Sequence, residues 1–225
     1  MSEDLAFTGG LDFTKASLEN ISKILIDDLH EKYGMLTEVS EPIKEISNVQ
    51  TWKIKVLTQG IQKHLPQQRI NIDICAIPSY EKKAMFLLNP YGIDLGTNGL
   101  IIQVESKEEI FVDKLIAFAF RPNRIKYRDI WDILWLHQTF IKPRMNYLVD
   151  KVFVRNKTKQ DFLNSFRERT TMLRKSEKLM NEYRNEMFRF LPKESIEPVF
   201  NQTNYWQSIV NVFELYEKMI ENELQ

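Results

Sequence analysis

The stretch Ser106–Leu136, SKEEIFVDKLIAFAFRPNRIKYRDIWDILWL, decides the fold that this sequence predicts. It predicts two helices separated by a break at Arg121-Pro122-Asn123, since a residue before proline disfavours the helical conformation. A capping box begins the first helix: the Ser106 side chain accepts from the Glu109 amide, and the Glu109 side chain reaches back to Ser106. Apolar residues fill most later positions, so both helices should contribute to a core.

Three charged residues stand inside this apolar stretch: Lys114, Asp129 and Asp132. One explanation is structural, because a lysine on a buried helix is usually paired with a carboxylate or extends its ammonium to water. The other is functional, with Lys114 contacting phosphate and an aspartate beside it. The pattern alone leaves both explanations open.

The composition indicates a globular protein with a substantial core. Of 225 residues, 43% are hydrophobic, and the 31 Lys and Arg balance the 31 Asp and Glu, so net charge favours no class of partner. No apolar run reaches the roughly 18 residues that would cross a bilayer. Residues 2–15 are too polar for a signal peptide, and the single Cys75 fits a reducing compartment as a buried small hydrophobe. We therefore expect a cytoplasmic protein without a membrane segment.

The first hundred residues predict one helix and several short strands. Apolar spacing predicts a helix over 15–32 that ends at Gly34. In the strand that includes Asp73, three isoleucines alternate with polar residues, so Asp73 should lie on the opposite face from them. The predicted strands are 4–8, 35–39, 51–58, 69–77, 84–88 and 100–104.

Helices alone are predicted for the last third of the chain. Residues 156–191 lack Gly and Pro and predict one long helix, and 205–224 predict a second. Residues 151–193 hold twelve Lys and Arg against five Asp and Glu, whereas 194–225 hold one against six. This asymmetry suits either a nucleic-acid surface or two helices that pair with each other.

Two motifs in this sequence resemble those of the AbiEii/AbiGii-type nucleotidyltransferase toxins. The first is E-E-I-x-x-x-K-L-x-A, a short break with an arginine, and R-D-I-x-D-I. The second is Ser2–Phe7, SEDLAF, against the family's S-x-D-L-D-F. The residues that match the first motif are Glu108, Glu109, Ile110, Lys114, Leu115, Ala117, Arg121, Arg128, Asp129, Ile130, Asp132 and Ile133.

The resemblance implies a mixed α/β (α+β) fold. A small mixed sheet would be flanked by helices, as in polymerase-β-like nucleotidyltransferases. This domain would span residues 1–140, and a helical C-terminal subdomain would span 141–225. The implied activity is that of a toxin of bacterial toxin–antitoxin or phage-defence systems. It would transfer a nucleotide from an NTP, with GTP as one candidate, to RNA or another acceptor. Mg²⁺ would be the cofactor, and an antitoxin protein is an expected partner.

The resemblance also assigns roles to individual residues. Lys114 would contact the phosphates of the nucleotide, together with Arg121 and Arg128. Asp129 would orient Lys114 or act as a base. These assignments predict a catalytic and nucleotide-binding site around the two helices of the opening stretch.

The metal-binding half of the family pattern is incomplete in this sequence. Asp4 takes the first carboxylate position and Asp73 the third, but Ala6 stands at the second. The family's glycine turn upstream of the motif does not precede it here, and Gly9-Gly10 follows it as an ordinary turn. Two interpretations follow: a transferase whose gene product is shortened, or a divergent binding module with little or no transfer activity.

Overall fold

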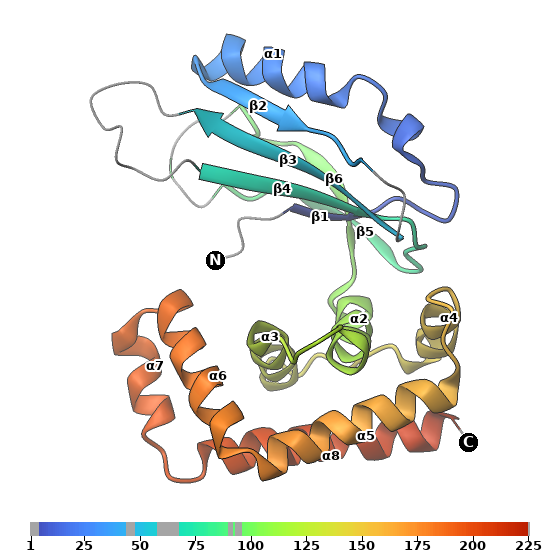
Figure 1. Ribbon diagram of the computed structural model, residues 1–225, viewed down its shortest axis with the longest axis vertical. Coiled ribbons are helices and arrows are strands. Elements are labelled where there is room, and N and C mark those ends of the chain that lie inside the picture. The colour runs from blue at the N-terminus through green and yellow to red at the C-terminus, as the bar shows by residue number, and fades with distance from the viewer. Residues whose placement is uncertain (1–4, 44–47, 58–67, 90–91, 93–95, 225) are drawn as a thin grey trace. The chain divides into compact units, whose positions relative to one another are not determined.

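The computed structural model describes residues 5–43, 48–57, 68–89, 92 and 96–224. The chain forms two compact units, Met1–Ser79 and Tyr80–Gln225, which are described separately. Helices and two small sheets make a mixed α+β protein, as the sequence predicted (Figure 1). The predicted division at residue 140 stays a prediction.

The first unit is built on a four-stranded sheet with the order β1-β4-β3-β2. β1 runs parallel to β4, and the other neighbours are antiparallel, so the sheet is mixed. Helix α1 (Ile21–Tyr33) packs beside β2 (Figure 1). The strands are β1 (Leu5–Thr8), β2 (Leu36–Ser40), β3 (Val49–Leu57) and β4 (Gln68–Cys75), which confirms the four strands predicted there.

Local sequence explains most of this unit. Trp52 and Ile54 alternate with polar residues in β3 and are buried, as the period of two predicts. Gly34 closes α1 in the left-handed conformation, with φ of 64°. The predicted start of the helix at residue 15 is wrong, because Asn20 is left-handed and separates the short 3-10 helix η1 (Lys15–Leu18) from α1.

The second unit joins a two-stranded antiparallel sheet to seven α-helices among the described residues. The sheet consists of β5 (Lys82–Phe86) and β6 (Ile101–Glu105), close to two of the predicted strands. The helices are α2 (Lys107–Phe120), α3 (Tyr127–Gln138), α4 (Leu148–Phe153), α5 (Lys159–Lys175), α6 (Glu177–Phe190), α7 (Lys193–Phe200) and α8 (Tyr205–Leu224), with a 3-10 turn η2 (Met145–Tyr147) before α4.

The single helix predicted over 156–191 is wrong, because the chain breaks at Ser176. Ser176 has extended backbone angles, φ −106° and ψ 101°, and it ends α5 while it begins α6. Its side chain accepts from the Leu179 amide at 3.2 Å, so the new helix start is capped. A serine cap therefore ends a helix here without glycine or proline.

Helix α2 lies in the centre of the second unit's core. Phe118 of α2 contacts Phe166 of α5 and Phe213 of α8, with ring centroids 5.2 and 4.5 Å apart. All three rings are at most 1% exposed. The prediction that the opening stretch forms buried helices is confirmed.

Ion pairs join α5 to α8 along their length. Arg167 pairs with Glu217 and Glu221, and Arg174 pairs with Glu214. The basic and acidic segments therefore pair in part with each other, as one of the two alternatives predicted. Among the described helices, none is long and apolar enough to span a membrane.

A buried lysine ties the small sheet to the helices. The Lys151 ammonium of α4 lies 3.2 Å from Glu105, 2.8 Å from Glu109 and 2.6 Å from Asp113, and Lys151 is 1% exposed. The ring of Tyr80 covers this ammonium at 5.6 Å. Such a cluster holds its elements firmly, because removing one partner leaves an uncompensated buried charge.

The cluster also changes the predicted capping box. Ser106 accepts from the Glu109 amide at 3.1 Å, which confirms half of it. The Glu109 carboxylate does not reach back to Ser106. It accepts instead from the amides of Tyr80 and Glu81, at 2.9 and 2.6 Å, and it pairs with the Lys151 ammonium at 2.8 Å.

We expect Glu105→Gln to flatten the pH dependence of stability between about pH 5 and 7.5. Burial, then the neighbouring Asp113 charge, raises the pKa of Glu105 from 4.5 to about 7. The folded state therefore holds this proton more tightly than the unfolded state, and stability present below pH 4.5 is lost as the pH rises through 7.

Between about pH 5 and 7.5, the free energy of unfolding should fall in both proteins by different amounts. The fall should be up to about 3 kcal/mol larger in the native chain than in the variant. Urea denaturation at several pH values, followed by circular dichroism, measures it. The amide keeps an oxygen for Lys151, so Glu105→Gln tests the proton and not the contact. Parallel pH profiles for the two proteins would contradict the prediction.

Candidate functional site

Asp129 pairs with cationic side chains between α2 and α3. This carboxylate is 1% exposed, and it accepts from Arg121 Nε at 2.9 Å and from Lys114 Nζ at 3.4 Å. Lys114 also lies 2.6 Å from Asp132, whose side chain is 40% exposed. The structure thus brings together Lys114, Arg121 and Asp129, three residues that the sequence predicted for the site.

The break between α2 and α3 is strongly cationic. We call Arg121, Arg124, Lys126 and Arg128 the cationic turn. Burial lowers the pKa of Lys126, and the charges of Arg121, Arg128 and Lys114 lower it further, with Asp129 as the opposing influence. The turn therefore concentrates positive charge beyond what its aspartates offset, which favours an anionic ligand.

Arg169 of α5 supports the turn from beneath and was missed by the sequence analysis. Its guanidinium donates to the backbone carbonyls of Arg121 and Arg124. Burial lowers the pKa of Arg169, and the charge of Arg121 acts in the same direction. Lys126 was also missed, although four cationic residues within eight positions give a visible signal in the sequence.

Arg128 is held differently from Arg121. Its guanidinium lies over the ring of Phe190 of α6, 4.7 Å from the centroid. Its Nε is buried and has no hydrogen-bond partner among the described residues. Stacking fixes the plane of this cation, and the buried Nε is closed to a ligand as it is to solvent, so only the terminal nitrogens of the guanidinium are candidates for a ligand contact.

The carboxylate predicted for metal in the first unit is Asp73 of β4. It accepts from the Thr51 hydroxyl at 2.6 Å, and in the parallel pairing of β1 with β4 its direct neighbour is Ala6. Asp4 lies outside the described residues. Mg²⁺ commonly takes one or two carboxylates together with substrate phosphates. Asp73 supplies one carboxylate, whereas the methyl group of Ala6 cannot contribute to a two-metal arrangement.

Glu105, Glu109 and Asp113 form another acidic group, with ligand oxygens within 4.8 Å of one another. The Lys151 ammonium lies within 3.2 Å of all three carboxylates and already supplies the positive charge there. A divalent ion would have to displace this buried lysine. We therefore interpret the group as a structural ion cluster.

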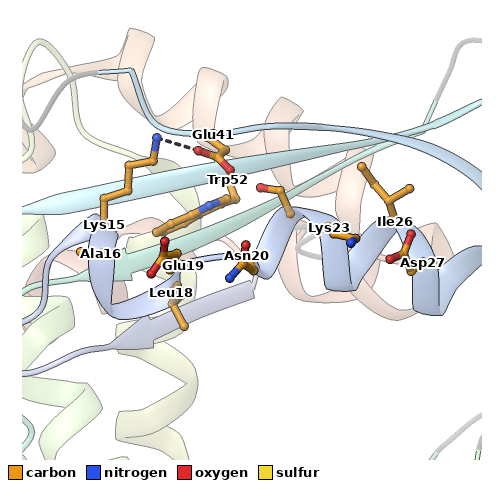
Figure 2. A pocket seen from close by; sticks show the side chains of 11 residues that line it. Lys15, Ala16, Leu18, Glu19, Asn20, Lys23, Ile26, Asp27, Glu41 and Trp52 are labelled. Carbon is orange, nitrogen blue, oxygen red and sulfur yellow. Dashed lines mark ion pairs between the residues drawn. The ribbon is translucent and has the colours of Figure 1, made fainter.

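A cavity of about 780 Å³ lies in the first unit between η1, α1 and Trp52 of β3 (Figure 2). The Lys15 ammonium and the Glu41 carboxylate, 2.6 Å apart, form an ion pair at its edge. Further lining residues include Lys23, Glu19 and Asp27, so the lining mixes both charge signs. None of the site residues predicted from the sequence lines this cavity.

The family model described as "Nucleotidyl transferase AbiEii toxin, Type IV TA system" matches residues 1–209 of the 225 residues. The matched span contains both sequence motifs, the cationic turn and the start of α8. Among curated proteins, none matches the chain.

We expect Asp129→Asn to destabilise the protein more than Asp132→Asn. The first change removes the buried charge that holds Arg121 and Lys114 and should lower the free energy of unfolding by about 1–3 kcal/mol. The second weakens one partly exposed pair and should cost less than about 1 kcal/mol. Urea denaturation of the two matched variants measures the difference. Equal losses would show that Asp129 does not organise the site.

Proposed function

Since the chain belongs to the AbiEii family of nucleotidyl transferase toxins of type IV toxin–antitoxin systems, we propose that it binds a nucleoside triphosphate through Lys114 and the cationic turn. GTP is the first nucleotide to test. Transfer of the nucleotide to an acceptor RNA is the proposed reaction, with Mg²⁺ as cofactor. Membership of the family implies an antitoxin as the counterpart of the protein.

One observation carries the nucleotide-binding proposal: four cationic residues crowd the α2–α3 break, and Lys126 and Arg128 have no ion-pair partner there among the described residues. A triphosphate would offset this repulsion, because its oxygens accept charge-assisted hydrogen bonds from lysine and arginine. Asp129 supports the arrangement from the buried side, where it fixes Arg121 and Lys114. The three side chains are thereby set in place before a ligand arrives.

The chain's own residues divide the proposed work. Lys114 would contact phosphate while Asp129 orients it. The Lys114 side chain is 31% exposed and therefore accessible to a ligand. Asp73 would hold Mg²⁺, which neutralises phosphate charge when it is bound. Phosphoryl transfer depends mainly on such positioning and neutralisation. Ala6 removes one carboxylate from that set, so we expect slow transfer.

Replacing Lys114 by Ala should weaken NTP binding about tenfold or more, because one charge-assisted contact to phosphate is lost. Isothermal titration calorimetry with GTP and Mg²⁺ measures the dissociation constant. Lys107→Ala is the matched control: Lys107 is an exposed lysine on the same helix, and its ammonium lies over the Trp135 ring at 5.3 Å.

The control should bind GTP like the native chain. Absence of any NTP binding by the native chain, with Mg²⁺ present, would remove the proposal. Should Lys114→Ala raise the melting temperature while leaving NTP affinity unchanged, the Lys114–Asp129 pair is structural.

The position of Ala6 beside Asp73 favours a second candidate function, a nucleotide- or RNA-binding module without transfer. Ala6→Asp distinguishes the two. Ala6 is exposed, and neighbouring strands lie about 4.8 Å apart, so the new carboxylate would stand next to Asp73 on the same face.

We expect Ala6→Asp to increase Mg²⁺-dependent incorporation of labelled nucleotide into RNA by at least about tenfold, given the size of effects from single charge-stabilising groups. Ala6→Asn keeps the shape without the charge and should not increase it. No incorporation by either the native chain or Ala6→Asp would favour the binding module.

A further inference from the structure

A smaller cavity, about 310 Å³, lies in the second unit between α6, the end of α7 and the start of α8. Four aromatic residues line it: Tyr183, Phe200, Tyr205 and Trp206. Its volume is at the lower end of the range for ligand pockets, roughly 300–1,000 Å³, so it suits one ring system and not a whole nucleoside triphosphate.

The aromatic walls are fixed by contacts with one another. The Tyr183 ring lies 5.9 Å from Phe200 and 5.6 Å from Trp206, and the Tyr183 and Tyr205 hydroxyls are 3.1 Å apart. Trp206 Nε1 donates to the Leu173 carbonyl at 3.0 Å. A ligand would therefore enter a pocket whose rings need little reordering.

Apart from Met180, the rest of the lining is polar, and none of it is a carboxylate. Asn181, Gln202 and Thr203 are exposed, and Arg184 donates to Asn201 at 3.0 Å. Amides offer both donors and acceptors to the edge of a base, and one guanidinium suits a nearby phosphate. This lining matches a flat heterocycle that is attached to an anionic backbone.

The pocket is next to the element that carries the cationic turn's last residues. Tyr183 lies 6.4 Å, ring to ring, from Tyr127, which immediately precedes Arg128 and Asp129 in α3. Arg128 itself stacks on Phe190 of α6, the helix that supplies Tyr183. Contacts between α3 and α6 thus connect the cationic residues, which suit phosphate, with the aromatic pocket, which suits a base.

We propose that this pocket holds one unpaired nucleobase of a single-stranded RNA. The inference deepens the proposed function and rests on it, because it names the acceptor as an RNA that presents an unstacked base. Aromatic side chains bind bases by stacking, and recognition of single strands depends on this stacking together with a basic surface. A free nucleotide offers the same base, so the experiment separates the two sources.

The experiment compares short fluorescent RNAs on the full chain by anisotropy. A single-stranded RNA should bind about 5- to 150-fold more tightly than an equally charged strand with abasic positions, the range expected for one stacked base. The same sequence as a duplex should also bind more weakly. Equal affinities for the single strand and the abasic strand would overturn the inference, because only backbone charge would then be bound.

Matched arginine variants separate the pocket from general charge. Arg184→Gln and Arg189→Gln each remove one cation from α6, and Arg184 lines the pocket while Arg189 is exposed and does not. Arg184→Gln should lose several-fold more affinity for the single strand than Arg189→Gln. Equal losses overturn the inference.

Trp206→Ala should abolish the preference for the single strand over the abasic strand. Because this change could unfold α8, photocrosslinking of the native chain with RNA that contains 4-thiouridine supplies a second measurement. Crosslinks within 180–206 support the pocket, and crosslinks confined to other segments overturn it. A mononucleotide that competes fully with the RNA would overturn RNA as the source of the base.

Calorimetry with GTP separates this inference from the proposed function. Intact GTP binding without a preference for bases in RNA overturns the pocket alone. A base-dependent RNA interaction without NTP binding overturns nucleotide binding at Lys114 and leaves the pocket.

Discussion

The organisation of the second unit depends on the pairing of the Lys151 ammonium with three carboxylates. Glu109 and Asp113 are four residues apart and share one face of α2, so Lys151 fixes the rotation of that helix against α4. Lys114 follows Asp113 and therefore points about 100° further around the helix, toward α3. One buried ion cluster thus determines the direction in which the site lysine projects, although it takes no part in the proposed chemistry.

Features that depend on neighbouring residues could be predicted from the sequence. The Ser106 cap, the break at Arg121–Asn123 and the alternation in β3 each follow from local rules, and the structure contains all three. The Lys151 cluster could not be predicted, because its three partners are 38 to 46 residues away and no local pattern connects them. The break at Ser176 was missed for a related reason, since an isolated serine is common inside helices and marks an end only when packing favours it.

The candidate site also combines features that the sequence predicted with one that depends on packing. Pairing of Lys114 with Asp129 was one of two alternatives from the sequence, and the structure contains the pair without excluding a phosphate contact, because Lys114 remains partly exposed. The family resemblance assigned Ala6 and Asp73 to the second and third carboxylate positions, and the observed register makes them direct neighbours. Arg169 could not be predicted, because its role arises from the packing of α5 beneath the turn.

The cationic turn carries more positive charge than its connection of α2 to α3 requires. Asp129 already satisfies Arg121 and Lys114, so Lys126 and Arg128 add repulsion without adding an ion pair among the described residues. Neutral residues at these two positions would give the free protein a higher stability, because they would remove the repulsion. Crowded positive charge without ion-pair partners is typical of sites that bind an anion, since the ligand supplies the missing opposite charge. In the proposed function, the same crowding costs the free protein stability and would contribute affinity for a phosphate chain.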